Sequence, residues 1–537
     1  MQTVSSSQQL VQCLRQTPQA FPHPAGQVQC IETHISWVLL AGEFAYKLKK
    51  PVQMDVLDFR TLAQRHAACL EELRINRRTA PDLYLAVLPV CGCVQAPRIG
   101  GSGPVLDWVV QMRRFDQAGL FSDLIAKDRL WPKHIDDLAR QVAAFHECAD
   151  RAPGDSAFAQ PAAQCEWVRQ NLESLHAMVG ADPPGLVEAL VRWSEAESQA
   201  LAPLLAQRLN EGWVRECHGD LHLGNLVLID GKPQLFDAIE FNPALRWIDV
   251  LADVAFLFMD LQSHGRADLA WRFLNAYLER TGDYAGLRVL PYHLSYRAAV
   301  RAKVAALRLA QSQVQGRVER QGNGQEEDSG PQGAALRQDV ARYLQRACRY
   351  TQLRAPWLWI TCGVSGSGKS SQTQSLIEAR GMVRLRSDVE RKRMFGLQPE
   401  ASSEGLSGIY TPDATHRTYA QLAAQARAVL QAGLPVLVDA TFLRRRERDD
   451  FRVLARSLGL PFRVLAFDAP EALLRERIRQ RAEAGGDASE ATQAVLSAQL
   501  AQREPLAPDE LLQAVRIEAL APVDWSTLLP MTTCSHL

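Results

Sequence analysis

The sequence lacks several features that would assign it to a protein class at once. No apolar run approaches the length of a membrane span, so we expect no membrane partner. Residues 1–7 show no charged region followed by an apolar stretch, and we expect no signal peptide. The net charge is zero, with 60 basic and 60 acidic residues, which argues against a nucleic-acid partner.

Paired cysteines are also missing. The eleven cysteines are scattered singly; Cys91 and Cys93 are the closest pair, and no pair has the two-residue gap of a zinc knuckle. Free thiols are typical of a reducing compartment, so the sequence predicts a cytoplasmic protein.

The order of predicted elements changes along the 537 residues, a length that favours more than one domain. Residues 35–40 and 44–48 read as a hairpin, residues 62–77 as a helix, and residues 83–90 and 106–113 as strands. After about residue 134 the pattern is mainly helical. Strands first and helices later is the order of a two-lobed, α+β protein-kinase-like fold.

The C-terminal part alternates instead. Strand-like runs at 358–362, 382–385, 435–438 and 462–467 are each followed by helical sequence. This alternation predicts an α/β fold with a parallel sheet and crossover helices.

Residues 311–337 contain almost no large apolar side chains. Such a segment buries too little to offset the entropy of ordering, so it predicts a flexible linker or loop between two helices. The predicted organisation is a first kinase domain at 1–310, this linker, a connecting helix at 338–354 and a second kinase domain at 355–537. There is no internal repeat.

The first chemical motif runs from His218 to Asn225 and is followed by Asp237. Phosphoryl transfer needs a carboxylate for the acceptor hydroxyl and oxygen ligands for Mg²⁺. Asp220 is the candidate base, and Asn225 and Asp237 are the candidate metal ligands. Residues 226–236 read as strand, Asp-Gly turn and strand, which would bring Asn225 and Asp237 side by side.

This motif resembles the aminoglycoside phosphotransferase and choline kinase-like family, and the resemblance covers roughly residues 28–305. It implies that Lys47, in Phe-Ala-Tyr-Lys, binds phosphate, with Lys49 and Lys50 as close rivals. It implies Glu72 as the ion-pair partner of that lysine, and Glu71 stays open. The segment 107–112 resembles the hinge that receives adenine, or else is a core strand.

The family's glycine-rich loop is missing before Lys47, and no long activation segment follows Asp237. A protein substrate would lack its docking platform, so the sequence predicts a small-molecule hydroxyl acceptor. Between residues 266 and 303, seven basic residues face three acidic ones, which disfavours a polycationic acceptor. Arg301 is the candidate substrate residue here; alternatively these arginines coat a solvated helix face.

The second motif, Gly363-Val-Ser-Gly-Ser-Gly-Lys-Ser370, follows a predicted strand and begins a helix. It is a phosphate-binding loop, in which backbone N–H groups and the helix N-terminus bind the phosphates of a nucleotide. Lys369 would reach the β and γ phosphates, and Ser370 would ligate Mg²⁺. The predicted nucleotide-binding set is Gly363, Ser365, Gly366, Ser367, Gly368, Lys369, Ser370 and Ser371.

Charged residues beyond this loop narrow the chemistry. Asp388 lies where the next strand ends and a helix begins, and Arg391 follows one turn later. They are candidates for a catalytic base and an anion-binding substrate residue, although Asp388 could simply begin a helix and pair with Arg391. Asp439, at the end of a buried strand, is a candidate for metal support. Arg477 and Arg481 share a helix face and are candidate lid arginines that bind the triphosphate, or else a solvated face.

Residues 355–510 resemble P-loop kinases of the gluconate kinase-like, polynucleotide kinase-like and zeta-toxin-like types. The whole layout resembles bacterial fusions of a phosphotransferase domain with a P-loop kinase. The sequence therefore predicts a bifunctional enzyme in which each half transfers the γ-phosphate of ATP, with Mg²⁺, to a hydroxyl of a sugar- or polyol-like metabolite.

Two other hypotheses remain at this point. The chain could be a regulatory ATP-binding protein with one catalytic half. Its P-loop half could also be a nucleic-acid end-kinase or a toxin, which the neutral charge disfavours. The sequence does not specify an oligomeric state.

Overall fold

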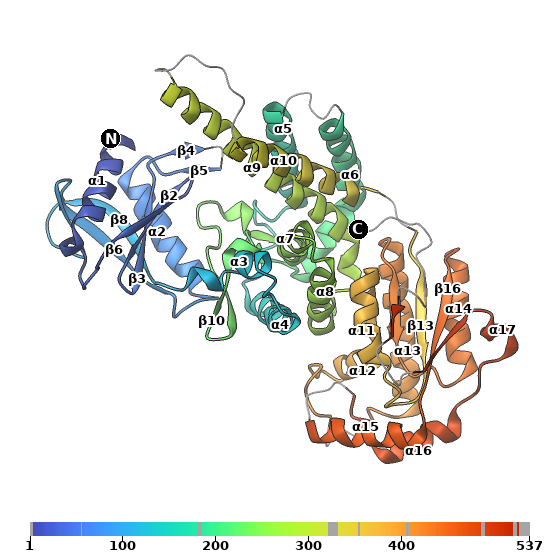
Figure 1. Cartoon of the computed structure of the whole chain (residues 1–537). Coiled ribbons are helices and arrows are strands. Elements are labelled where there is room, and N and C mark those ends of the chain that lie inside the picture. The colour runs from blue at the N-terminus through green and yellow to red at the C-terminus, as the bar shows by residue number, and fades with distance from the viewer. Residues whose placement is uncertain are drawn as a thin grey trace. The chain divides into compact units, whose positions relative to one another are not determined.

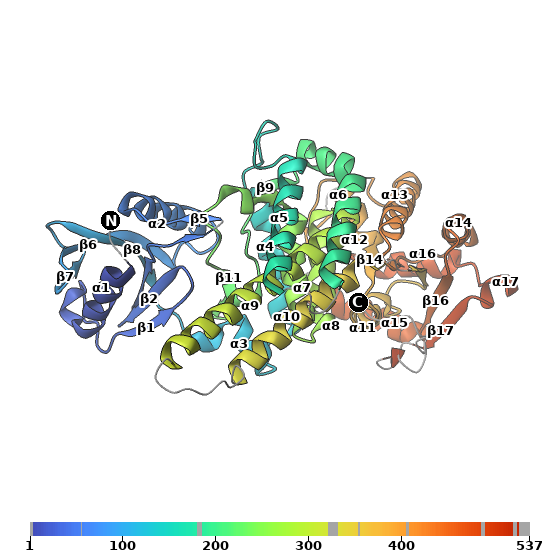
Figure 2. The ribbon, with the colours of Figure 1, turned by 90° about the horizontal axis from the view of Figure 1, so that it is seen from above.

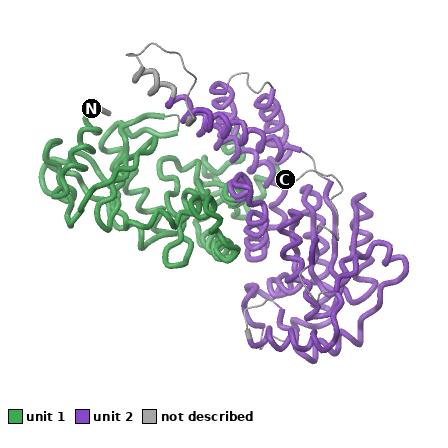
Figure 3. The backbone as a smooth tube through the Cα atoms, viewed as in Figure 1, with its two compact units in different colours: residues 1–166, 203–257 green, residues 167–202, 258–537 purple. Residues whose placement is uncertain are grey.

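The computed structural model describes residues 4–54, 56–179, 185–320, 331–352, 355–403, 408–484, 489–518 and 523–525. The chain forms two compact units, each made of two stretches of sequence (Figure 3). The first contains residues 1–166 and 203–257, and the second contains residues 167–202 and 258–537. This division differs from the predicted one because residues from 258 onward pack with the C-terminal part. The two units are defined by packing and do not test the predicted domain boundaries, which stay a prediction.

A six-stranded antiparallel sheet in the order β1-β2-β3-β8-β6-β7 dominates the start of the first unit (Figure 1). Its strands are β1 (Gln29–Glu32), β2 (Ser36–Ala41), β3 (Phe44–Lys49), β6 (Tyr84–Cys93), β7 (Ala96–Ile99) and β8 (Val105–Arg113). The predicted hairpin is β2–β3. A short pair, β4 (Gln53–Met54) and β5 (Leu57–Asp58), follows it.

Two helices cover opposite faces of this sheet (Figure 2). Side chains alternate along β2, so Leu39 packs with the core of α1 (Val4–Gln16) and Leu40 with that of α2 (Leu62–Asn76). Thr61 and Gln64 form a capping box that fixes the start of α2.

The remainder of the first unit carries the loop of the first motif. Two antiparallel pairs, β10–β11 and β9–β12, flank this loop. The elements here are α3 (Phe121–Ala126), α4 (Pro132–Cys148), β9 (Val214–Glu216), β10 (Leu226–Ile229), β11 (Lys232–Leu235) and β12 (Trp247–Asp249). Helix α7 (Val250–Ser263) follows and runs on into the second unit.

Long helices form the first part of the second unit. They are most of α5 (Pro161–Val179) and of α6 (Leu186–Glu211), whose remaining residues belong to the first unit, and α8 (Ala267–Thr281), α9 (Leu290–Arg320) and α10 (Pro331–Tyr350). Helix α9 packs along α10. The segment predicted as a linker differs from that expectation at both ends: α9 continues to Arg320, and α10 begins at Pro331. Its Gln-, Arg- and Ala-rich ends have high helix propensity and extend both helices. Residues 321–330 lie outside the described residues.

The rest of the second unit is a five-stranded parallel sheet in the order β14-β15-β13-β16-β17, which confirms the predicted α/β fold. Its strands are β13 (Leu358–Cys362), β14 (Val383–Arg386), β15 (Val436–Asp439), β16 (Phe462–Asp468) and β17 (Ala514–Glu518). Its helices are α11 (Lys369–Arg380), α12 (Ser387–Met394), α13 (Pro412–Gln431), α14 (Arg445–Ser457), α15 (Glu471–Ala484), α16 (Gln493–Gln502) and α17 (Pro508–Leu511). The carboxyl ends of β13, β14 and β15 meet at one edge, where ligands bind in such sheets.

The adenine-hinge interpretation of residues 107–112 is not what the structure shows. These residues lie in β8, between β3 and β6, and the buried Asp107 pairs with Arg65. The segment is a core strand, the alternative left open by its apolar sequence. Within the described ranges, no helix combines the length and apolarity needed to cross a membrane.

Candidate active sites

The first candidate site is built on the loop before the β10–β11 hairpin. Asn225 Nδ2 donates to Asp220 Oδ2 and to the Asp220 carbonyl, both at 2.9 Å. The hairpin turns at Asp230-Gly231, both with positive φ, and pairs Leu226 with Leu235. It therefore brings Asn225 and Asp237 to the same end, as predicted.

A buried carboxylate that sequence reasoning missed holds this loop. Asp253 in α7 accepts the backbone N–H of His218 at 2.7 Å and of Gly219 at 2.9 Å. His218 in turn places a ring nitrogen 2.9 Å from the Phe236 carbonyl, directly before Asp237. Burial lowers the pKa of His218 and favours the neutral ring. Asp253 was detectable as an acidic residue within the apolar run Val-Leu-Ala-Asp-Val-Ala-Phe-Leu.

Lys47 in β3 reaches both predicted partners. Its Nζ lies 2.8 Å from Glu72 Oε1 and 2.5 Å from Asp237 Oδ1. Burial works to lower the pKa of Lys47, but Asp237 and Glu72 outweigh it and raise that pKa well above its usual value. Lys47 is therefore a permanent cation beside the candidate metal ligand.

The rival lysines occupy different environments. Lys49 is fully buried, with its Nζ 2.5 Å from Glu72 Oε2 and also paired with Glu240, a residue that the sequence analysis did not single out. Lys50 instead pairs with Glu32 at 2.6 Å, on the outer hairpin. Of the three lysines, Lys47 is the one paired with Asp237. Its phosphate-binding role stays a prediction, because these contacts do not test it.

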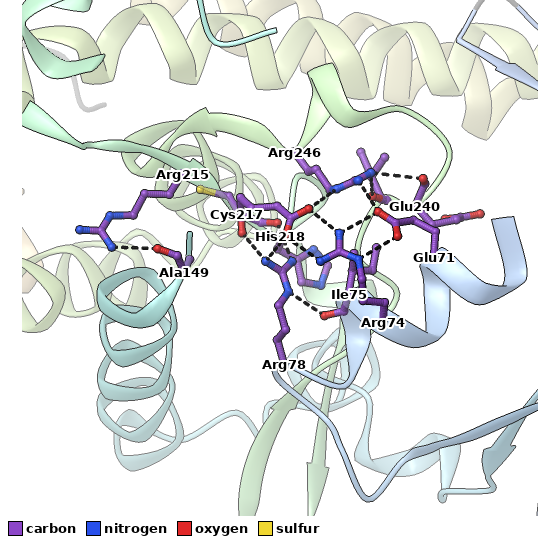
Figure 4. A network of polar contacts seen from close by, with 12 residues as sticks. Glu71, Arg74, Ile75, Arg78, Ala149, Arg215, Cys217, His218, Glu240 and Arg246 are labelled. Carbon is purple, nitrogen blue, oxygen red and sulfur yellow. Dashed lines mark hydrogen bonds and ion pairs between the residues drawn. The ribbon is translucent and has the colours of Figure 1, made fainter. Parts of the chain in front are cut away.

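Glu71, the alternative to Glu72, belongs to a separate ion-pair network (Figure 4). The buried carboxylate of Glu216 is its centre and contacts Arg74 at 2.6 Å, Arg78 at 3.0 Å and Arg246 at 3.0 Å. Arg246 also pairs with Glu71.

This network ties α2 to both chemical segments. Arg78 donates to the carbonyls of Glu216 and Cys217, just before His218. Arg246 donates to the carbonyls of Ile239 and Glu240, just after Asp237. The helix that carries Glu72 is thus fastened to the segments that carry Asp220 and Asp237.

Among the described residues, His146, Cys217 and Asp253 place ligand atoms within 4.8 Å of one another. Their atoms already have protein partners: Asp253 accepts two backbone N–H groups and faces His146 Nε2 at 3.4 Å, and the Cys217 thiol contacts the Ile248 carbonyl. We interpret this buried group as a support of the loop.

The second candidate site has the geometry of a phosphate-binding loop. Lys369 begins α11 and donates to the carbonyls of Gly363 and Val364, both at 2.9 Å. Gly366 has φ +81°, and a Cβ there would lie 2.8 Å from the Leu474 carbonyl, so the tight loop requires glycine. Ser367 is buried inside the loop, and the Ser365 backbone N–H donates to Gln499 at 2.7 Å.

Carboxylates converge on this loop. Ser370 Oγ donates to Asp439 Oδ2 at 2.6 Å, so the two predicted magnesium residues are in direct contact. Burial lowers the pKa of Lys369, and the nearby Asp439 and Asp388 counteract that effect. Asp388 stands in the first turn of α12, directly after β14.

Arg391 contacts residues other than the predicted ion-pair partner. Its Nη1 donates to the Ile409 carbonyl and to Thr415 Oγ1, both at 3.1 Å, and its guanidinium lies 5.4 Å from the Tyr410 ring centre. Its Nε is buried and has no hydrogen-bond partner. This leaves one donor of a buried arginine available on α12, the helix that also carries Asp388.

The remaining predicted residues differ in whether they contact the phosphate-binding loop. Arg477 donates to the Gly366 carbonyl at 3.3 Å, so it lies at the loop, whereas Arg481 contacts the Ala491 carbonyl. Ser371 Oγ bonds the Gly368 carbonyl within the helix start. Arg301 lies over the Tyr343 ring at 5.5 Å, in the packing of α9 on α10.

The excess of basic residues between 266 and 303 is largely paired. Arg266, Arg272, Arg280 and Arg288 bind Asp268, Glu378, Glu400 and Glu197 respectively. Those four arginines therefore support the alternative of a structural helix face. They no longer support the argument against a polycationic acceptor.

Comparisons with known proteins agree with the second site. A family model described as an AAA domain matches residues 358–506. Uncharacterized proteins of Mycobacterium bovis and of two strains of Mycobacterium tuberculosis are 31% identical over 476 residues, which is 88% of this chain and 89% of each relative.

Two solved structures resemble part of the chain. A sugar kinase from Janibacter sp. HTCC2649 has 23% identity and a TM-score of 0.25, and covers 31% of this chain and 87% of its own. A gluconokinase from Sinorhizobium meliloti 1021 has 25% identity and a TM-score of 0.23, and covers 32% of this chain and 86% of its own.

Proposed function

This chain belongs to one family with the three mycobacterial proteins, and we propose that it is an ATP-dependent phosphotransferase with two active sites. The observation that carries the proposal is the contact of Ser370 with Asp439 at the foot of a phosphate-binding loop, with Asp388 on the next helix. A phosphate-binding loop, a hydroxyl and carboxylate for Mg²⁺, and a candidate base are the residues that a P-loop kinase needs.

We propose that the first unit is a second, aminoglycoside phosphotransferase-like kinase. Its support is the group formed by Asp220 beside Asn225 and by Lys47 between Glu72 and Asp237. The motif named Asp220, Asn225 and Asp237, and the family resemblance implied Lys47 and Glu72. The fused arrangement is thereby proposed to be bifunctional.

In each proposed reaction, the acceptor oxygen forms a bond to the γ-phosphorus while the bond from that phosphorus to the bridging oxygen of ADP breaks. Asp220 in the first site, and Asp388 in the second, would accept the proton of the acceptor hydroxyl. The amide of Asn225 orients Asp220 for this step. Lys47 and Lys369 would balance the charge of the phosphates.

The donor sets suit Mg²⁺, which prefers oxygen ligands. Asn225 and Asp237 would hold it in the first site, and Ser370 with Asp439 in the second. When bound, the ion neutralises charge on the phosphates. We keep Arg477 and Arg481 as proposed triphosphate residues, and the contact of Arg477 with Gly366 favours it over Arg481.

The proposed acceptors are small hydroxylated metabolites, sugar- or polyol-like. After Asp237 the chain reaches β12 at Trp247 and α7 at Val250, so a protein substrate would find no long docking segment there. The described cysteines are free thiols, which supports the proposed cytoplasmic location.

The test uses the full chain and counts nucleotide sites by calorimetry with MgATP. We expect two sites, one lost in Asp237→Ala and the other in Lys369→Ala. Asp220→Ala should keep both sites while losing turnover by the first unit, measured in a screen of sugars, polyols, nucleosides and aminoglycosides. A single site abolished by Lys369→Ala would favour the alternative of one catalytic half.

A further inference from the structure

Helix α8 lies outside residues 358–506, yet it contacts the strand and helices of the P-loop site. Asn275 Nδ2 donates to the Met382 carbonyl at 2.9 Å, and the Arg384 backbone N–H donates to Asn275 Oδ1 at 2.7 Å. One side chain thus binds two backbone groups on the free side of this strand, the carbonyl just before β14 and the N–H of Arg384. Because β14 is an edge strand, this contact fixes a strand that would otherwise be held on one side only.

One turn further along α8, Glu279 links two arginines of the same strand. Its Oε1 accepts from Arg384 Nη2 at 2.9 Å, and its Oε2 accepts from Arg386 Nη1 at 3.3 Å. All three side chains are largely buried. Burial works to raise the pKa of Glu279, but Arg384 and Arg386 outweigh it and lower that pKa, so the carboxylate is ionised at neutral pH.

Both arginines lead to predicted site residues, the metal ligand Ser370 and the catalytic base Asp388. Arg384 Nη1 also donates to the Ser370 carbonyl at 3.2 Å, in the first turn after the phosphate-binding loop. Arg386 is the residue before α12, in which Asp388 stands second. The Glu279 carboxylate is therefore two contacts away from Ser370, and its second partner, Arg386, lies two positions before Asp388.

The C-terminal end of α8 holds α12 directly. Arg393 of α12 donates to the carbonyls of Glu279 at 2.6 Å and Arg280 at 2.9 Å. Carbonyls in the last turn of a helix have no partner within that helix, so Arg393 satisfies them from outside. Gly282 ends α8 with φ +73°, and a Cβ there would lie 2.9 Å from the Arg393 guanidinium. The close approach of Arg393 thus depends on glycine at this position.

We propose that Glu279 and Asn275 are positioning residues of the P-loop site. Through β14, α12 and Arg384, they hold Ser370 and Asp388 in the arrangement for phosphoryl transfer. This inference rests on the proposed function of the second site, and it makes that site dependent on a helix from outside the P-loop family match.

The test uses the full chain in an Asp237→Ala background, which silences the first site. The probe is MgATP, with water as the acceptor. Calorimetry gives the number of bound nucleotides per chain, and phosphate release gives turnover. We expect Glu279→Gln and Asn275→Ala to bind about one nucleotide per chain but to lose roughly tenfold to a hundredfold in turnover, because small displacements of reacting groups cost that much.

Arg272→Ala is the matched control. Arg272 lies on the same helix and pairs with Glu378 of α11 at 2.8 Å, so its loss weakens the same packing without touching β14 or α12. We expect its turnover to stay within about twofold of the background. Hydrogen exchange of residues 383–394 should rise in the Glu279 and Asn275 variants and not in Arg272→Ala.

Other outcomes would overturn the inference. Equal turnover in Glu279→Gln and Arg272→Ala would remove the positioning role, and so would a turnover loss matched by a loss of bound nucleotide, which indicates unfolding. If the background chain binds no MgATP that Lys369→Ala removes, the proposed function of the second site fails, and the inference fails with it.

Discussion

Alternation along a strand separates the three lysines of the first site. Lys47 and Lys49 are two residues apart in β3, so their side chains leave the same face and both meet Glu72. Lys50 lies past the strand end and pairs with Glu32. The period of two explains why Lys47 and Lys49 share Glu72 and Lys50 does not, a distinction that the sequence analysis left open among the three lysines.

Substitution of each lysine by methionine should separate chemistry from stability. We expect Lys47→Met to lower turnover of the first unit by about a hundredfold, because the cation beside Asp237 is lost. Lys49→Met should mainly destabilise the unit, by about 3 kcal/mol, because it leaves buried Glu240 without its cation. Lys50→Met should change the free energy of unfolding by less than about 1 kcal/mol. Urea unfolding and acceptor assays measure the two effects, and a turnover loss confined to Lys49→Met would contradict the assignment.

The stability supplied by Glu72 should depend on pH in a defined direction. Burial works to raise its pKa, but Lys47 and Lys49 outweigh it and lower that pKa to about 2. A carboxyl group with a lowered pKa stabilises the fold above its ordinary pKa, near 4.5, and this contribution is lost as the pH falls toward 2. We therefore expect Glu72→Gln to be less stable than the native chain at pH 7, with a difference that shrinks below about pH 4.

Urea unfolding at pH 7 and pH 3, followed by tryptophan fluorescence, checks this dependence. Glu43→Gln, at an exposed position on the β2–β3 turn, is the control and should show no such trend. A stability difference that stays constant between the two pH values would rule out the ionised Glu72.

At the scale of elements, the sequence predicted those features that depend on residues close together in the chain. The β10–β11 hairpin, helix α2 and the parallel strands follow from turn residues and periodicity. Partners far apart in the chain were missed: Glu240 meets Lys49 across 191 positions, and Asn275 meets Arg384 across 109. Each of these polar residues looks ordinary in its own segment, because its role is set by a partner that only folding brings near.

The network around Glu216 makes an element-scale prediction. Glu216→Gln removes the charge that three arginines share, so we expect the first unit to lose about 3 kcal/mol of unfolding free energy. Because the network ties α2 to the loop of Asp220, turnover by that unit should fall as well. Urea unfolding and acceptor turnover test both effects, with the exposed Glu147→Gln as the control. Unchanged stability would show that the network contributes nothing to the fold.

At the scale of the whole molecule, the helical segment after residue 258 belongs with the C-terminal sheet. A cut near residue 355, suggested by the motifs, would remove α8 and leave the β14 edge and two arginines without their partners. The two proposed activities are therefore better separated by point substitutions in the full chain than by truncation.

The remaining prediction concerns the relation of the two reactions. Covalent joining fixes their ratio and raises the local concentration of any compound passed between them. Arg391, buried on the same helix as Asp388 and with a free Nε, suits an acceptor that already carries a phosphate or carboxylate. The arginines between 266 and 303 that pair with carboxylates give no evidence for an anionic acceptor at the first site. We therefore expect the first unit to act on a neutral compound and the second on its phosphorylated product.

This order is tested by identifying the product of a Lys369→Ala chain and offering it, with MgATP, to an Asp237→Ala chain. We expect a second phosphorylation, which Arg391→Met should weaken chiefly by raising KM for the product. If that product is never phosphorylated further, while the first unit turns over an aminoglycoside efficiently, both the shared reaction sequence and the neutral acceptor are wrong.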